Sequence, residues 1–110
     1  MGTKGSKDTE AGRLAAEALV DRVQPLGAVT SKKMFGGYGV FLEGVMFAIV
    51  DSSGACYLRA TDATCGPYTE RGSQRHGRMP YWAIPDTVLA DDAVLVEWAS
   101  GALEIAAAAK

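Results

Sequence analysis

Few side chains in this sequence can bind a transition metal or act as a nucleophile. It contains two cysteines, Cys56 and Cys65, and a single histidine, His76. A zinc site needs three or four such ligands, and a histidine-based triad needs a nucleophile and an acid beside the histidine. The two cysteines are nine residues apart, and no nucleophile motif accompanies His76. We therefore expect no catalytic residue, no metal and no cofactor.

The sequence also lacks long apolar runs and an excess of positive charge. No run approaches the roughly 18 residues of a membrane span, and the polar start does not resemble a secretory signal. We expect a cytoplasmic protein whose cysteines are reduced. The chain has 11 basic and 13 acidic residues and a net charge of −2. Only a local basic patch could therefore contact nucleic acid.

What remains is the composition of one ordinary globular domain. Hydrophobic residues make up 48% of the 110 residues and charged residues 22%, as in a folded chain rather than a disordered one. A chain of this length buries roughly two-thirds of its unfolded surface, so it needs no disulfide or metal to be stable. Residues 1–8 are rich in Gly, Lys and Ser, and we expect a disordered leader there before a domain at 9–110.

Two segments have helical spacing, one near each end of the chain. Residues 9–24 are expected to form a helix that ends at Pro25 and Gly27. Its apolar stripe is predicted to contain Leu14, Ala15, Ala18, Leu19 and Val23. Residues 92–109 form the second helix, with Asp91 and Asp92 at its positive end. We expect Trp98, on the apolar stripe of that helix, to be a core residue rather than a binding residue.

Between the helices the pattern changes to that of strands. Strands are predicted at Val29–Phe35, Tyr38–Leu42, Val45–Val50, around Cys56–Arg59, and at Met79–Ile84. Every position of Val45–Val50 is apolar, which places that strand in the centre of the sheet. The Glu43-Gly44 pair predicts a tight hairpin turn. Thr61–Glu70 is expected to be a short helix, and Asp86 to cap another over residues 87–90. The fold class is α+β, with a four- or five-stranded, mainly antiparallel meander flanked by the two long helices.

Two further patterns have a plain structural explanation. The glycines of Gly36-Gly37-Tyr38-Gly39 lack the following Lys-Ser/Thr of a phosphate loop, so a bulge or bent strand is favoured. The carboxylates Asp91, Asp92, Glu97 and Glu104 are expected to cap a helix or lie on its solvated side. Residues 86–104 contain five acids and no Lys or Arg. Such a surface suits contact with a protein and repels DNA.

The strongest candidate for binding is the polar segment 71–78, called here the arginine loop. It contains Arg71, Arg75 and Arg78 and no acid, and Tyr68, Tyr81 and Trp82 flank it. Arginines among aromatics suit phosphate contact with base stacking. The alternative is a solubilising loop whose aromatics pack inward. Lys32 and Lys33 would extend this anion or nucleic-acid patch only if the first strand lies nearby.

The run Val29–Val40 resembles the signature of the TfoX N-terminal domain family. The residues that carry the resemblance are Met34, Phe35, Gly36, Gly37, Tyr38 and Gly39, followed later by Tyr57-Leu58-Arg59, Tyr81, Pro85 and Trp98. The resemblance implies an antiparallel sheet flanked by helices and a bacterial source. It also implies kinship with regulators of natural competence, which act at promoters with a cyclic-AMP receptor protein. Those regulators carry a second, C-terminal helical domain, and we expect this chain to represent a single-domain form.

These observations lead to three hypotheses about function. The first is a non-enzymatic regulatory or adaptor domain that contacts a protein, such as a component of the transcription machinery. The second is weak, direct nucleic-acid binding through the arginine loop. The third is binding of a small ligand, or an enzymatic role, in a cleft on the side of the sheet. A pocket with convergent polar groups would favour the third.

Overall fold

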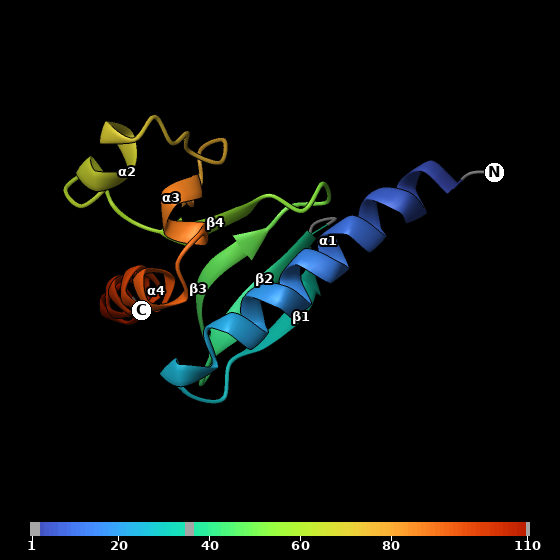
Figure 1. Ribbon diagram of the computed structural model, residues 1–110, viewed down its shortest axis with the longest axis horizontal. Coiled ribbons are helices and arrows are strands. Elements are labelled where there is room, and N and C mark those ends of the chain that lie inside the picture. Colours follow the sequence, from blue (N-terminus) through green and yellow to red (C-terminus); the bar gives the residue numbers. More distant parts are fainter. Residues whose placement is uncertain (1–2, 35–36, 110) are drawn as a thin grey trace.

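The computed structural model describes residues 3–34 and 37–109, with side chains from Glu10 onward. Its elements follow in the order α1 (Thr3–Arg22), η1 (Gln24–Leu26), β1 (Thr30–Met34), β2 (Gly37–Leu42), β3 (Val45–Val50), β4 (Cys56–Arg59), α2 (Gly66–Glu70), β5 (Tyr81–Ala83), α3 (Asp86–Leu89) and α4 (Asp92–Ala108). The five strands form one antiparallel sheet in the order β1-β2-β3-β4-β5. The predicted α+β fold with a meander and two flanking helices is confirmed (Figure 1).

The centre of the sheet agrees closely with the sequence pattern. β3 is the middle strand, and its bounds are those predicted from its unbroken apolar run. The turn before it has φ of 52° at Glu43 and 82° at Gly44, as a two-residue hairpin of the primed type requires. The pairing of β2 with β3 shifts register between Val40 and Phe41. Phe47 is the extra residue on β3, because Val40 faces Ala48 while Phe41 faces Met46.

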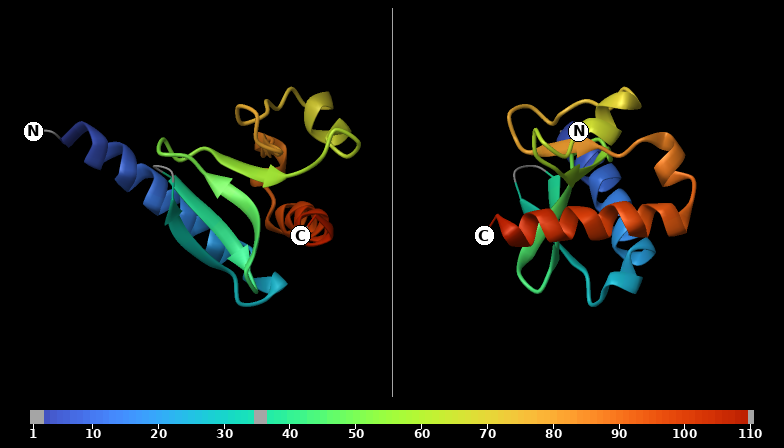
Figure 2. Two further views of the ribbon diagram at one scale, coloured as in Figure 1. Left: turned by 180° about the vertical axis from the view of Figure 1, so that it is seen from behind. Right: turned by 90° about the vertical axis from the view of Figure 1, so that its left-hand side faces the viewer.

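The two long helices pack against the same face of the sheet. Buried residues of α1 and α4 form a single core cluster with Val40, Ala48, Val50 and Leu58 from the strands. Seen from behind, β1 and β2 lie in front of α1, and no helix of the described residues covers the opposite face of these strands (Figure 2). Two buried side chains, Ile49 and Tyr81, lie outside the core cluster. We call this opposite side the open face of the sheet.

The first helix differs from its prediction in extent and in its buried stripe. It begins at Thr3 rather than at residue 9, since no proline interrupts the helical ladder there. Leu14 is 53% exposed, and Ala18 is also exposed. The buried stripe is Gly12, Ala16, Leu19 and Val23. A Cβ on Gly12 would lie 2.9 Å from the carbonyl oxygen of Asp51, so this small residue lets the helix approach the sheet on a face that hydrophobicity alone does not reveal.

The short elements also correct the prediction in detail. α3 begins at Asp86, and its N-cap residue is Pro85, so Asp86 is the first helical residue and not the cap. Pro85 has an extended ψ of 148°, as an N-cap residue does, so the helix begins one residue earlier than predicted. The last helix starts as expected, because the Asp91 carboxylate accepts the backbone N–H groups of Ala93 and Val94 at 3.0 and 3.2 Å.

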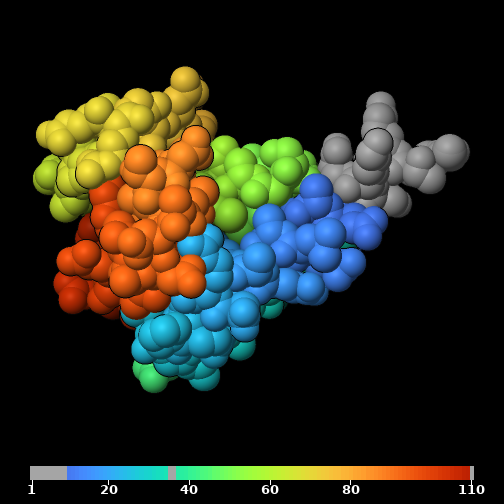
Figure 3. All heavy atoms as spheres, viewed as in Figure 1, coloured from blue at the N-terminus to red at the C-terminus, as the bar shows by residue number. Residues whose placement is uncertain are grey.

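An ion pair joins the end of α1 to the start of α4. Arg22 Nε donates to the Asp92 carboxylate at 2.7 Å, and its Nη2 donates to the carbonyl oxygen of Leu89. In the space-filling view, α3 and the start of α4 lie against the C-terminal end of α1 (Figure 3). The acidic segment therefore has one of its carboxylates engaged by a basic side chain.

Candidate functional site

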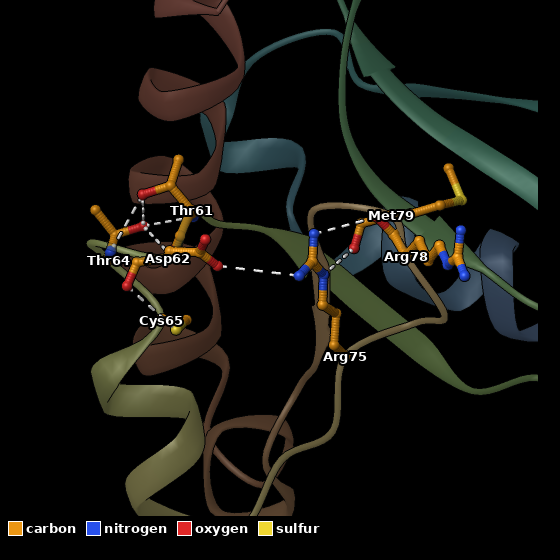
Figure 4. Close-up of polar contacts among 7 residues, drawn as sticks. All are labelled: Thr61, Asp62, Thr64, Cys65, Arg75, Arg78 and Met79. Carbon is orange, nitrogen blue, oxygen red and sulfur yellow. Dashed lines mark hydrogen bonds and ion pairs between the residues drawn. The ribbon is translucent and has the colours of Figure 1, made fainter.

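The arginine loop uses Arg75 to hold itself in shape. The Arg75 side chain donates from Nε to the carbonyl oxygen of Met79 at 2.9 Å and from Nη2 to that of Arg78 at 3.1 Å (Figure 4). Its guanidinium lies 5.0 Å from the centre of the Trp82 ring, and Nη1 is 3.9 Å from the Asp62 carboxylate. Much of the hydrogen-bonding capacity that a phosphate would need is therefore already committed.

The other two arginines of the loop have different surroundings. Arg71 Nη1 donates to the carbonyl oxygen of Pro67 at 3.1 Å, and its guanidinium lies 5.2 Å from the Trp98 ring. Arg78 is exposed, and its side chain makes no hydrogen bond or ion pair within the described residues. Arg78 is thus the loop arginine with most freedom to meet an anion.

The aromatic residues beside the loop pack inward. Tyr68, Tyr81 and Trp82 are only 6%, 2% and 4% exposed, so they present no ring on which a base could stack. Lys32 and Lys33 are exposed on β1. That strand is at the opposite edge of the sheet from β5, but Met34 at its end lines a cavity together with His76 of the arginine loop. The structure joins Arg75 to Arg78 through a hydrogen bond from Arg75 Nη2 to the carbonyl oxygen of Arg78, and the extension of the patch by Lys32 and Lys33 stays a prediction.

The arginine loop supports a prediction about DNA. We expect the chain to bind a duplex with a Kd of about 0.1 mM or weaker at physiological salt, because a small patch acts against a net negative charge. Three phosphate contacts would give a log–log salt slope of about −2.7, at about −0.9 each. Fluorescence anisotropy with a labelled duplex measures both quantities. The Arg71, Arg75 and Arg78 to Ser variant is compared with the Lys32 and Lys33 to Ser variant as its control. Micromolar binding at about 150 mM salt that only the arginine variant abolishes would contradict this expectation.

Gly37, Tyr38 and Gly39 of the Gly-Gly-Tyr-Gly block belong to β2 and not to a phosphate loop. A Cβ on Gly37 would lie 2.2 Å from the carbonyl oxygen of Val50, and one on Gly39 would lie 2.6 Å from the Met34 sulfur. These glycines therefore let neighbouring atoms approach the strand closely. The register irregularity is between Val40 and Phe41, and β1 pairs regularly with Gly37 and Gly39. Phe35 and Gly36 lie outside the described residues.

Other residues of the resemblance lie in the framework. Tyr38 is half-buried against the core, and Pro85 is buried where it precedes α3. The Tyr81 hydroxyl donates to the carbonyl oxygen of Met46 at 3.3 Å. Trp98 is half-buried, which corrects the expectation of a full core position. Its ring meets Tyr68 edge-on at 4.8 Å, and Arg71 covers part of it, because α4 turns this side chain to the rim of the core.

The open face contains a cavity of about 270 Å³, called here the methionine cavity. Three methionine side chains and one isoleucine, Met34, Met46, Met79 and Ile49, line it together with Gly37. The loop that carries His76 and Met79 forms one wall, and strands β1 to β3 form the floor. Sequence patterns did not single out this site. The apolar run of β3 could have indicated it. A strand that is apolar on both faces needs both faces covered, and the described helices cover only one of them.

Polar groups stand on one side of the methionine cavity. Burial alone would raise the pKa of Asp51, but hydrogen bonds from Ser53, Ala55 and Tyr57 outweigh it and hold the pKa below its usual value. The carboxylate is thus ionised at neutral pH. The His76 ring meets the Tyr57 ring edge-on at 4.6 Å. The cavity therefore combines an apolar, adaptable lining with an anionic rim.

The thiols do not form a reactive centre. Burial, together with the nearby charge of Asp51, raises the pKa of Cys56 to about 11, so it is a protonated thiol and a poor nucleophile. Cys65 is half-buried, and both cysteines are free. Within residues 3–34 and 37–109, no three His, Cys, Asp or Glu side chains gather as a metal site would require. No helix in this part of the chain is long and apolar enough to cross a membrane.

Comparison with known proteins gives one finding. The family model described as the TfoX N-terminal domain matches residues 21–106. The matched region runs from the end of α1 through the whole sheet to the last turns of α4. A search of curated proteins found no match.

Proposed function

The chain belongs to the TfoX N-terminal domain family, and from that premise we propose that it is a non-enzymatic regulatory domain that binds a protein partner. Family membership supports a domain of the competence-regulator type. The partner we propose is a component or regulator of the transcription machinery. Its contact point is the methionine cavity, which receives an apolar side chain of the partner.

The observation that carries this proposal is the open face of the sheet. One face of β2 and β3 is buried by α1 and α4, while the other side of the sheet holds a cavity with three methionines. Methionine side chains are unbranched and polarizable, so surfaces rich in them adapt to apolar partners. The anionic rim at Asp51 would favour a partner segment with a basic residue beside its apolar one.

A protein partner agrees with the charges better than a nucleic acid does. The net charge is −2, and Arg75 of the arginine loop donates its hydrogen bonds to nearby backbone carbonyl groups. The side chains of Asp91, Glu97 and Glu104 along α4 are exposed. Phosphate backbones would meet repulsion on that side of the molecule.

The proposal predicts that one substitution on the open face abolishes capture of the partner. Met79→Glu places a charge in the methionine cavity, close to Asp51, and burying an unpaired carboxylate there opposes docking of an apolar side chain. We expect a tagged wild-type chain to retain a transcription protein from a bacterial lysate, and the variant to lose at least about 90% of it, which is the tenfold change that about 1.4 kcal/mol produces. Quantitative mass spectrometry measures the retained amount.

The matched control is Leu14→Glu, which introduces the same charge at an exposed position of α1. This variant should retain the partner at the wild-type level. Thermal melts of both variants check that each is folded. If Met79→Glu is folded and still captures the same proteins as Leu14→Glu, the methionine cavity is not the contact point and the proposal is wrong.

A further inference from the structure

Arg59, the last residue of β4, has a buried donor without an acceptor. Its Nε is inaccessible to solvent and makes no hydrogen bond within the described part of the chain. No acidic side chain that the structure describes forms an ion pair with it. A buried charged donor is costly unless it is paired. The fold therefore leaves one donor of the Arg59 guanidinium unpaired within the described residues.

The surroundings of Arg59 supply aromatic contact but no negative charge. Its guanidinium carbon lies 5.7 Å from the centre of the Tyr81 ring. Burial raises the pKa of the Tyr81 hydroxyl, and a hydrogen bond with the Arg59 side chain and the charge of Arg59 oppose that rise. The hydroxyl donates its own proton to the carbonyl oxygen of Met46. Tyr81 is thus a neutral neighbour and does not neutralise the arginine.

A pocket of about 240 Å³ opens beside Arg59, between α2 and α4. Its other lining residues are neutral and mostly apolar: Thr64, Pro67, Tyr68, Trp98, Gly101, Ala102 and Ile105. Arg59 is the one charged residue of this lining. Glu97 and Glu104 are exposed on α4 and do not line the pocket.

We propose that this pocket binds a small organic acid, with the carboxylate on Arg59 and the apolar body between Tyr68, Trp98 and Ile105. A guanidinium presents paired donors that match a carboxylate. A doubly charged phosphate is disfavoured, because the lining of the pocket offers one cation. The volume suits a molecule of one ring with a short side arm. This site is separate from the methionine cavity and does not depend on it.

The test uses phenylacetate as the probe and phenylacetamide as its neutral analogue of the same shape. Two-dimensional ¹H–¹⁵N NMR follows the Arg59 Nε–H and the Trp98 indole N–H during titration of the full chain. We expect both signals to shift saturably with phenylacetate, and an affinity for phenylacetamide that is about tenfold lower or worse, as loss of a charged hydrogen bond implies.

Two variants separate the charge from the pocket. Arg59→Met keeps an apolar stem and should abolish the shift of Trp98 with phenylacetate. Gly101→Leu should also abolish it by filling the pocket, and it should leave the fold intact because an added Cβ meets nothing within 4 Å. Met79→Glu lies at the other site and should bind the probe as the wild type does, so failure of the protein-contact proposal would not affect this one. No saturable shift with phenylacetate, equal affinity for both probes, or binding that survives Arg59→Met would overturn the inference.

Discussion

Replacing Gly37 with alanine should lower the free energy of unfolding by about 3 kcal/mol or more, at or beyond the upper end of the usual cost of overpacking. The added methyl carbon would lie 2.2 Å from the carbonyl oxygen of Val50 and 3.1 Å from the Cα of Asp51. Both obstacles are backbone atoms, so no rotamer change relieves the clash. Strands β2 and β3 would have to separate at the centre of the sheet. Urea unfolding followed by circular dichroism measures the loss.

The matched control for Gly37→Ala is Gly66→Ala. An added Cβ at Gly66 meets nothing within 4 Å, and Gly66 is the first residue of α2. Removing a glycine there should be neutral or stabilise the fold by about 0.4–1 kcal/mol, chiefly through the unfolded state. If Gly37→Ala were as stable as the wild type while Gly66→Ala behaved as expected, the close approach of β3 to Gly37 would be incorrect.

Gly37 and Gly39 of the family signature are therefore explained by packing rather than by chemistry. Gly37 admits the backbone of β3, and Gly39 admits the sulfur atoms of Met34 and Met46. The two sulfurs lie over Gly39, where the strand has no side chain. The open face is therefore hollowed at this point, beside the methionine cavity. The signature in this way shapes a binding surface without contributing a reactive group.

Much of the fold could be predicted because its signals are local. The unbroken apolar run of β3, the Glu43-Gly44 turn and the Asp91 cap each depend on residues within a few positions of one another. The buried face of α1 could not be predicted in the same way. It depends on Gly12 meeting Asp51 across the structure, and the exposed Leu14 appears more hydrophobic than the residues that are buried.

The candidate sites were less predictable, because they depend on which residues meet in space. The arginine loop was visible as a cluster of charge, but the hydrogen bonds of Arg75 to its own loop were not. The methionine cavity joins residues from β1, β3 and the loop before β5. Arg59 belongs to the Tyr57-Leu58-Arg59 match, yet alternation along the strand shows only its side of the sheet. That its Nε lacks an acceptor can be seen only in the folded chain, where α2 and α4 lie beside it.

Replacing Phe47 with alanine should cost about 3–5 kcal/mol, as removal of a buried aromatic side chain does. Phe47 is completely buried and belongs to the core cluster between the helices and the sheet. It is also the extra residue where the register of β2 and β3 shifts. Such a bulge turns a side chain towards the face where it is needed. The truncation would leave a cavity in the core cluster, because the backbone of a paired strand cannot move in to fill it.

Leu14→Ala provides the comparison for Phe47→Ala, because Leu14 is a large apolar residue that is 53% exposed. Its loss should change stability by no more than about 0.5 kcal/mol. Urea unfolding of both variants should give unchanged m-values, since the same surface is exposed on unfolding. A domain of this size has only about 5–15 kcal/mol of stability, so Phe47→Ala should also raise the fraction of unfolded chain at 37 °C. Equal midpoints for the two variants would mean that the bulge does not direct Phe47 into the core, and that the open face of β3 extends further along the strand than the structure indicates.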